Sequence, residues 1–188
     1  MPTTRDTAAC KNLPPSVAYL PDATVDAALD AEIRSLLTTC FKKPQDTVFE
    51  TQRYFREPYP HRWIVRDTDG RMVAHIGVHE KRVHAGDTVL PIAGIAEVCV
   101  HPDCRGRGYV RCMLDTVHAR MGDAGRLFAV LFGNPDVYRS SGYLPCDNLV
   151  HDADAPDGGP CRATNTLVRP LAGRPWPTGE VYLPGPKF

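Results

Sequence analysis

Apolar positions recur along the chain with two spacings, and each spacing predicts a different kind of element. One spacing is that of an amphipathic helix, with apolar residues three or four positions apart. Helices are expected at residues 25–41, 47–55, 105–121 and 134–141. Asp22 or Thr24 is the expected cap of the first helix, because a short polar side chain there can accept a backbone N–H.

The other spacing gives short, strand-like apolar runs, and these runs predict most of the sheet. Strands are expected at residues 16–20, on both sides of Asp69–Gly70, and at residues 89–100, 126–132 and 164–168. Asp69–Gly70 between two such runs is a strong hairpin signal. The order of elements predicts a mixed α+β sheet with one helical crossover. We expect a single domain over residues 16–188, preceded by a flexible arm at residues 1–15.

Composition narrows the class of protein. The chain has 188 residues and a formal net charge of +0 at pH 7, which argues against a nucleic-acid partner. No apolar run approaches the ~20 residues of a membrane helix. The first residues lack an apolar signal core, and the seven cysteines follow no framework spacing. We therefore expect a cytoplasmic protein with reduced thiols and no membrane partner.

One group of potential metal ligands lies close together in the sequence. Its members are Cys99, His101, Cys104 and Cys112. They include no C-x-x-C pair, and Cys99 falls inside a strand-like run, so we predict no metal site.

The segment HPDCRGRGYV, residues 101–110, places glycines and arginines where a helix begins. A helix N-terminus carries unpaired backbone N–H groups and the positive end of the helix dipole. Gly106 and Gly108 allow an anion to approach that backbone, and Arg105 and Arg107 add positive charge. The pattern predicts a diphosphate site, with an ordinary tight turn as the alternative.

This turn resembles the [RQ]-x-x-G-x-[GA] motif of the GNAT superfamily of acyl-CoA-dependent N-acetyltransferases, which follows a strand ending in V-x-P. The matching residues are Val100, His101 and Pro102, then Arg105, Gly106, Arg107, Gly108, Tyr109 and Val110, where Val110 replaces a small residue. A second family element is similar to NPDVYRSSGYLP, which contains Asn134, Tyr138, Gly142 and Tyr143. Together the two elements extend the resemblance over roughly residues 16–170.

The resemblance implies an α+β fold of the GNAT type. Such a fold has a mixed, mostly antiparallel central sheet flanked by helices, with splayed central strands that admit the pantetheine arm. Here the splayed strands would be residues 95–100 and 128–132. The implied cofactor is acetyl-CoA, and its contacts are expected at Val98, Cys99, Val100, Arg105, Gly106, Arg107, Gly108, Tyr109, Val110 and Asn134.

Acetyl transfer to an amine needs a base for the amine, stabilisation of the carbonyl oxygen and a proton for the departing thiolate. By the resemblance Tyr138 is the general acid, with a packing tyrosine as the alternative. Glu97 is the preferred base, because it is the carboxylate of the otherwise apolar strand AGIAEVCV. Strand alternation would place it on one face with Ile95 and Cys99. Rival bases are Glu80, His79 and His75.

Two narrower resemblances concern the substrate. Residues 74–144 look like aminoglycoside 2'-N-acetyltransferases, and the tail WPTGEVYLPGP is similar both to those enzymes and to the rhizobial nodulation N-acyltransferase. Glu180 in this tail is expected to contact a cationic acceptor, with Trp176 fixing the tail. The acidic loop containing Asp152, Asp154 and Asp157 is expected to be a solvated turn.

These features favour a soluble acetyl-CoA-dependent N-acetyltransferase that acts on the primary amine of a small molecule by direct attack in a ternary complex. An amino sugar or aminoglycoside is one candidate acceptor. The alternatives are a longer-chain N-acyltransferase and a non-catalytic acyl-CoA-binding module that regulates a partner. The resemblance also allows a homodimer.

Overall fold

The computed structural model describes residues 16–152 and 159–188. The predicted arm at residues 1–15 and the loop residues Asp154 and Asp157 lie outside these ranges. The elements are β1 (Val17–Pro21), η1 (Asp22–Thr24), α1 (Ala27–Cys40), η2 (Pro44–Glu50), β2 (His61–Arg66), β3 (Met72–Ala85), β4 (Thr88–Val100), η3 (Pro102–Cys104), α2 (Tyr109–Asp123), β5 (Phe128–Phe132), α3 (Pro135–Tyr138), η4 (Arg139–Ser141), β6 (Leu144–Pro145), β7 (Leu149–Asp152), β8 (Pro160–Arg162), β9 (Thr166–Pro170) and β10 (Val181–Leu183).

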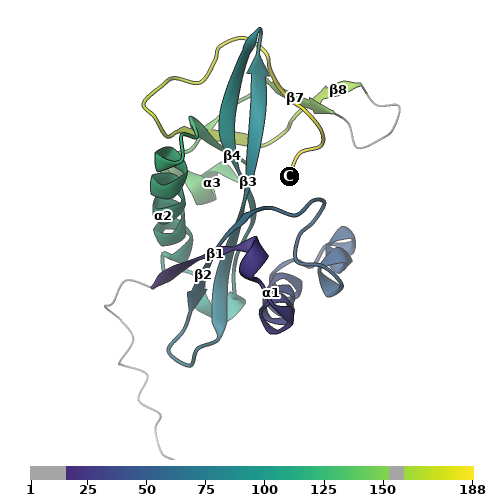
Figure 1. The fold of residues 1–188 in the computed structure, drawn as a ribbon, viewed down its shortest axis with the longest axis vertical. Helices are drawn as coiled ribbons and strands as arrows, with labels where there is room; N and C mark the ends of the chain where they lie inside the picture. The colour runs from purple at the N-terminus through teal and green to yellow at the C-terminus, as the bar shows by residue number, and fades with distance from the viewer. Residues whose placement is uncertain (1–15, 153–158) are drawn as a thin grey trace, which may run out of the picture.

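The long antiparallel hairpin of β3 and β4 is the centre of the sheet (Figure 1). The strand order is β6-β9-β5-β4-β3-β10-β7-β8, while β2 and β1 extend the sheet from the first half of β3. In the described residues the β4–β5 and β10–β7 pairs are parallel and the other pairs are antiparallel. The predicted mixed, mostly antiparallel sheet with a helical crossover from β4 to β5 is therefore confirmed.

Helices α1 and α2 cover opposite faces of this sheet, as alternation along β2 demonstrates. Trp63 and Val65 pack in the core beneath α2, whereas Ile64 between them packs in the core beneath α1. A third apolar cluster joins the outer half of the hairpin to β5, β9 and the last strands. Side chains on both faces of the central strands are buried, which explains why β3 begins as a nearly continuous apolar run.

Local chemistry moves several predicted boundaries. Helix α1 is capped by Asp26, whose carboxylate accepts the Leu29 N–H at 2.8 Å, and not by Asp22 or Thr24. The second predicted helix is the 3-10 segment η2, which begins at Pro44. Helix α2 starts at Tyr109 and not at residue 105, because Gly106 and Gly108 have φ values of +73° and +75°, outside the helical region.

Candidate active site

The central strands β4 and β5 separate near their C-terminal ends. They pair at Ile92 with Phe128, at Ala93 with Ala129 and at Gly94 with Val130, and the pairing stops there. Residues 95–100 of β4 continue beside β3 without pairing to β5. The splay predicted from the sequence is thus present, although on β5 it begins after Val130 and not at Phe128.

A β-bulge in β4 turns Glu97 away from the face expected by alternation. Two residues of β4, Glu97 and Val98, stand opposite Ile76 alone, and Glu97 has a φ of +42°. Ile95 therefore packs beneath α2, while Cys99 packs beneath α1. The prediction that Ile95, Glu97 and Cys99 share one face is wrong, because an inserted residue reverses the alternation that follows it.

Below the bulge, the turn before α2 forms one side of a hollow of about 510 Å³, here called the turn cleft. Nine of the predicted cofactor residues line it: Val98, Cys99, Val100, Arg105, Gly106, Arg107, Gly108, Tyr109 and Val110. Asn134 does not line it; its side chain accepts the Asp136 N–H at 3.0 Å and caps α3.

The turn cleft has the features of an anion site. A Cβ placed at Gly106 or Gly108 would meet nothing within 4 Å, so the space over this backbone is open. The first N–H groups of α2 have no partner within the helix. The arginines beside them are exposed: Arg105 Nε donates to the Val100 carbonyl at 3.4 Å, and Arg107 donates to the Asp103 carbonyl at 3.3 Å. Positive charge and open N–H groups suit a diphosphate.

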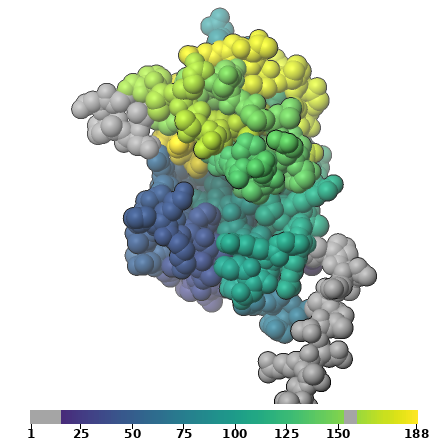
Figure 2. Space-filling model, turned by 180° about the vertical axis from the view of Figure 1, so that it is seen from behind, coloured from purple at the N-terminus to yellow at the C-terminus, as the bar shows by residue number. Residues whose placement is uncertain are grey.

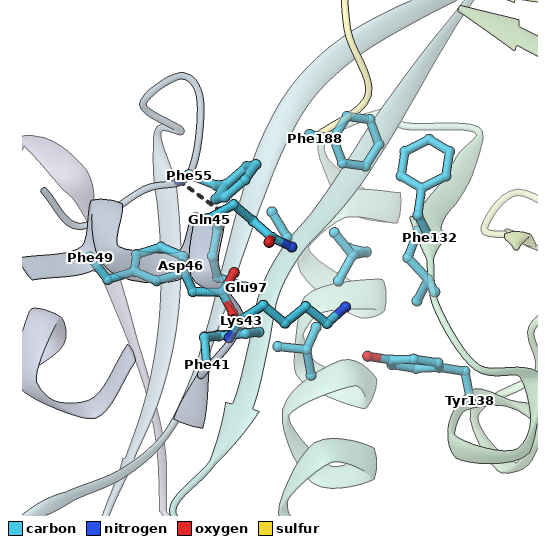
Figure 3. A pocket seen from close by; sticks show the side chains of 14 residues that line it. Phe41, Lys43, Gln45, Asp46, Phe49, Phe55, Glu97, Phe132, Tyr138 and Phe188 are labelled. Atoms are coloured by element: carbon cyan, nitrogen blue, oxygen red, sulfur yellow. Dashed lines mark hydrogen bonds between the residues drawn. The ribbon is translucent and has the colours of Figure 1, made fainter. Parts of the chain in front are cut away.

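A second hollow, here called the ring cleft, adjoins the turn cleft. Its volume is about 260 Å³, and it lies between the η2 region, the end of β5 and the C-terminal segment (Figures 2 and 3). Phe41, Val98 and Tyr138 line both clefts. A molecule lying in the turn cleft can therefore present one end to a molecule in the ring cleft at these residues.

Glu97 is the enclosed carboxyl group of the ring cleft on β4. Its Oε1 accepts the Phe55 N–H at 3.0 Å, while its Oε2 is enclosed and accepts no hydrogen bond from the described residues. Burial raises the pKa of Glu97 to about 7, although the Tyr59 hydroxyl, the Phe55 N–H and the Arg62 guanidinium favour the charged form. A carboxyl group with this pKa can take up and release a proton near neutral pH.

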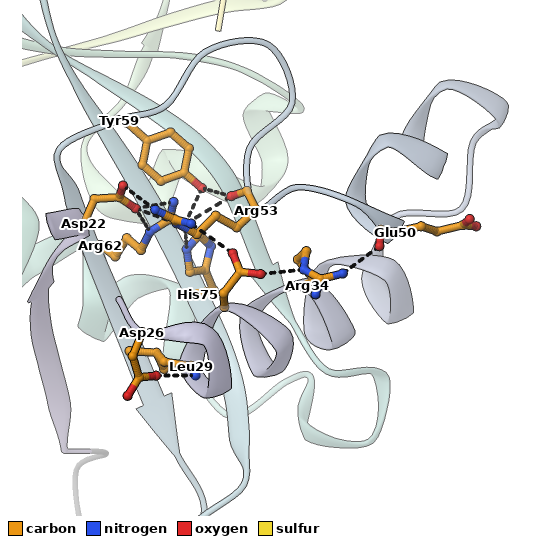
Figure 4. Close-up of polar contacts among 10 residues, drawn as sticks. Asp22, Asp26, Leu29, Arg34, Glu50, Arg53, Tyr59, Arg62 and His75 are labelled. Atoms are coloured by element: carbon orange, nitrogen blue, oxygen red, sulfur yellow. Dashed lines mark hydrogen bonds and ion pairs between the residues drawn. The ribbon is translucent and has the colours of Figure 1, made fainter. Parts of the chain in front are cut away.

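Beneath Glu97, a buried polar chain fixes the bulge (Figure 4). Arg62 is fully buried and donates to the Tyr59 hydroxyl at 2.9 Å and to His75 Nε2 at 3.1 Å. Burial, with the nearby Arg62 charge, lowers the pKa of His75 to about 3, so the ring is neutral. Because its Nε2 accepts, its Nδ1–H donates, and it does so to the Glu97 carbonyl at 3.1 Å.

The positive charge of the buried Arg62 is neutralised by Asp22 of η1. Its Nε donates to Asp22 at 2.6 Å, and Arg53 binds the same carboxylate at 2.9 and 2.8 Å. Burial alone would raise the pKa of Asp22, but the hydrogen bonds from Arg53 and Arg62 outweigh it and hold the pKa below its usual range. Arg53 also reaches Asp30 of α1 at 2.9 Å, which ties this helix to the site.

Tyr138 faces Glu97 across the ring cleft (Figure 3). Its ring lies against Gly133, where a Cβ would come within 2.8 Å of Tyr138 Cε2, and against Tyr143 at 5.9 Å between centroids. Burial raises the pKa of Tyr138 to about 12, with the neighbouring Cys99 adding to the shift. The phenol therefore keeps its proton at neutral pH and can donate it.

The rival bases lie elsewhere or are otherwise engaged. Glu80 pairs with His61 at 3.1 Å and with Arg126 at 3.3 Å, outside both clefts. His79 packs between the rings of Tyr59 and Phe188, at 5.1 and 5.5 Å, and burial lowers its pKa to about 4. His75 supports the bulge from beneath. Of the predicted carboxylates and histidines, the structure brings Glu97 into the ring cleft with Tyr138.

The tail reaches the ring cleft through Phe188, and not through Glu180 as expected. Glu180 is exposed and lines a separate hollow with His84 and Gly86, at the tip of the β3–β4 hairpin. The expected contact between Glu180 and the acceptor is therefore not supported; the pairing of β10 with β3 at His84 holds this part of the tail away. Trp176 packs on Phe128 at 5.0 Å between centroids and donates to Asn148 at 2.9 Å.

The sequence reasoning missed the aromatic wall of the ring cleft and the polar chain beneath it. Of Tyr59 and Arg62, the sequence signalled only Arg62. A charged residue near the start of the apolar strand HRWIVR suggests a buried partner. The phenylalanines of the wall come from segments far apart in sequence. Among the described residues, no group of three or more His, Cys, Asp or Glu side chains could hold a metal ion. Likewise, no helix in the described ranges could cross a membrane.

Comparison with known proteins identifies the family. Residues 25–146 match the family model of the acetyltransferase (GNAT) domain. The chain belongs to the GNAT family of acetyltransferases. The resemblance to the GNAT superfamily drawn from the turn and from NPDVYRSSGYLP is thereby confirmed.

One curated relative of this GNAT chain matches about half of it. N-acetyltransferase Eis of Mycobacterium tuberculosis is 37% identical over 101 residues, which cover 47% of this chain and 25% of that protein. The chain thus spans about a quarter of the length of the curated relatives that it matches. The two narrower resemblances to aminoglycoside and nodulation enzymes stay predictions.

Solved GNAT structures agree with the fold. The GNAT family N-acetyltransferase YhbS of Escherichia coli, in complex with CoA, has a TM-score of 0.64 at 19% identity and covers 96% of this chain and 93% of its own. A GNAT family acetyltransferase of Brucella melitensis, in complex with acetyl-CoA, has a TM-score of 0.59 at 18% identity, with 88% and 94% covered. These likenesses confirm the predicted GNAT-type fold.

Proposed function

We propose that the protein transfers an acetyl group from acetyl-CoA to the primary amine of a small molecule, by direct attack in a ternary complex. The observation that carries the proposal is that Tyr138 lies where the two clefts meet and faces Glu97 across the ring cleft. A thioester at the end of the turn cleft and an amine in the ring cleft would meet between an available base and an available acid.

The residues of the turn cleft suit acetyl-CoA, which supplies the activated acetyl group. The glycines at 106 and 108 and the first N–H groups of α2 would hold the diphosphate, with Arg105 and Arg107 adding charge. Backbone groups of Val98 and Val100, left unpaired to β5 by the splay, would bind the pantetheine arm. A backbone N–H near Val98 or Cys99 would stabilise the carbonyl oxygen as it gains negative charge.

Glu97 would accept the proton that the attacking amine must lose. An alkylammonium in water has a pKa near ~10.4, well above the pKa of about 7 of Glu97. Burial in the ring cleft narrows this gap, because desolvation lowers the pKa of an ammonium as it raises that of a carboxylate. Tyr138, which stays protonated at neutral pH, would donate to the departing thiolate.

A longer acyl chain and a purely regulatory acyl-CoA-binding role are the alternatives. A longer chain in the ring cleft would bury apolar atoms against the unpartnered Glu97 Oε2, which favours an amine there instead. A binding module has no use for a base and an acid on the two sides of one junction.

Replacement of Tyr138 by Phe tests the proposed function. The variant should lower kcat by ~10²-fold or more, the lower end of general-acid effects, with KM for acetyl-CoA unchanged. Release of the free thiol is followed with a panel of primary amines. Tyr182→Phe is the matched control and should keep full activity, because it removes a hydroxyl bonded to Asp152 and Tyr182 lines neither cleft. Turnover within twofold of the native value in Tyr138→Phe would show that Tyr138 only packs.

A further inference from the structure

The ring cleft is walled by aromatic side chains from several segments. Phenylalanine rings line it at positions 41, 49, 55, 132 and 188. Phe41, Phe49 and Phe55 stand on one side, and Phe132 and Phe188 on the other (Figure 3). Such a wall offers apolar area and ring faces, and it offers few hydrogen bonds.

The rings hold one another in place. Phe49 lies 5.3 Å from Phe41 and 6.2 Å from Phe55, between centroids, and Phe132 lies 5.1 Å from Phe188. The Phe188 ring occupies the space over Gly94, where a Cβ would approach it to 2.7 Å. Because the rings pack against each other and against the strand, the cleft is formed before any ligand enters it.

The polar groups of the cleft are few. Asp46 caps η2 by accepting the Lys43 N–H at 2.8 Å, and the exposed side chains of Lys43 and Gln45 reach over the cleft from η2 (Figure 3). Glu97 Oε2 is enclosed and has no partner among the described residues. The enclosed Oε2 of Glu97 therefore suits a positively charged group, and the rings around it suit apolar surface.

We infer that the acceptor is a primary amine on a short chain that carries an aromatic or similarly compact apolar group, such as an arylalkylamine. This inference rests on the proposed function and names its substrate class. The ammonium would meet Glu97, and the apolar group would lie between the two ring walls, where ring faces also attract a nearby cation. The wall rings are thereby specificity-determining residues.

A polyhydroxylated amine fits this cleft poorly. Hydroxyl groups placed against phenylalanine rings give up hydrogen bonds to water and receive none in return. The cleft volume of about 260 Å³ also lies below the ~300–1,000 Å³ of pockets for drug-sized ligands, so a molecule of several sugar rings would remain largely outside. This distinguishes an apolar amine from the amino sugar or aminoglycoside considered from the sequence.

Specificity constants with acetyl-CoA test the inference directly. The full chain is assayed with 2-phenylethylamine, ethylamine, glucosamine and kanamycin. We expect kcat/KM for 2-phenylethylamine to exceed that for glucosamine and kanamycin by about 100-fold, which corresponds to about 2.7 kcal/mol of transition-state binding. Equal or better turnover of the sugar amines would overturn the inference and leave the proposed function standing.

Assaying a wall variant with one amine that has a ring and one that lacks it tests whether the wall contacts the substrate ring. Phe132→Ala should lower kcat/KM for 2-phenylethylamine about tenfold and change it less than twofold for ethylamine, which has no ring to place there. Leu144→Ala, an exposed apolar truncation, is the control and should change neither value. Equal losses with both amines would overturn the assignment of the wall to the substrate ring. Phe188→Ala provides a second variant if Phe132→Ala fails to fold.

Two further outcomes distinguish a failure of this inference from a failure of the proposed function on which it rests. If hexanoyl-CoA outperforms acetyl-CoA while 2-phenylethylamine is no better than ethylamine, the wall holds the acyl chain and the inference is wrong. If acetyl-CoA binds but none of the four amines, nor any amine of a wider panel, is acetylated, the proposed function itself fails and the inference falls with it.

Discussion

The turn cleft and the ring cleft meet at Tyr138, yet they are built in different ways. Most of the turn cleft comes from one continuous segment, residues 98–111, and its main chemical feature is backbone geometry. The ring cleft is assembled from residues 41–55, 95–98, 131–138 and 188, and its character comes from side chains. One cleft is a local motif, and the other is a product of tertiary packing.

This difference suits the two clefts to the different tasks proposed for them. A diphosphate is recognised by N–H groups and positive charge, which a short glycine-rich turn can supply by itself. An apolar acceptor is recognised by shape and by a single charge, which need walls from several segments. The two clefts should therefore respond separately to substitution, and the following predictions test that separation from the largest effect to the smallest.

Gly108→Asp should abolish acetyl-CoA binding. The change places a side chain with a negative charge in the open space over the turn, where the diphosphate is proposed to bind. Gly125→Asp is a matched control, because Gly125 has a φ of +78°, open space around it and no part in either cleft. Both variants carry the same left-handed strain, of ~1–2 kcal/mol. Calorimetry that finds equal affinity in the two variants would refute the assignment of the turn cleft.

Glu97→Gln should lower kcat by ~10²–10⁴-fold and leave acetyl-CoA affinity unchanged. A base acts when it is deprotonated, so native activity should rise with pH through about 7, the pKa of Glu97. The variant should lose this limb of the pH profile of kcat/KM. A native profile without an inflection near 7, or a variant that keeps it, would count against Glu97 as the base.

The same substitution should stabilise the fold at alkaline pH. The pKa of Glu97 rises from an ordinary 4.5 to about 7 on folding, so the folded state holds the proton more tightly. Ionised Glu97 therefore lowers the free energy of unfolding. This destabilisation is absent below pH 4.5, grows as the pH rises to 7 and then stays near ~3 kcal/mol. Urea titrations at pH 4.5 and pH 8 should therefore show Glu97→Gln equal to the native protein in acid and more stable in base.

Asp22→Asn should destabilise the support of the ring cleft by about 2 kcal/mol. The fully buried Arg62 would lose its counter-charge, but Asp22 is partly exposed, so the effect stays below the ~3–5 kcal/mol of a fully buried pair. Because the pKa of Asp22 is lowered, the difference from the native protein should shrink as pH falls through that pKa. Asp87→Asn at the exposed hairpin turn is the control. A melting temperature unchanged from native would contradict the role of this ion pair.

Glu180→Gln should have the smallest effect, within about twofold on acceptor KM. Glu180 is exposed at a hollow near the hairpin tip, and neither cleft contains it. Steady-state kinetics with a cationic amine measures this directly. A KM raised tenfold would restore the role expected for Glu180 from the sequence, and it would mean that the acceptor extends beyond the ring cleft.

The sequence by itself determined the fold class and the turn cleft. Hydrophobic spacing predicted the hairpin at Asp69–Gly70 and the crossover from β4 to β5, because both depend on local patterns. The turn residues 105–110 are contiguous, and two glycines beside arginines at the start of a helix form a local pattern, so the geometry of this turn could be anticipated. Tyr138 was proposed in the same way, from its spacing to Gly142 in the sequence, and its role stays a prediction.

Only the tertiary structure decided which side chains form the ring cleft. The bulge at Glu97 reversed the alternation on which the face assignment depended, and a β-bulge is set by the pairing of two strands that sequence spacing does not reveal. Phe49 and Phe132 are 83 residues apart in the numbering and share one cleft. The position of Glu180 outside both clefts has the same origin: strand pairing, and not the local motif, decides where a tail residue lies.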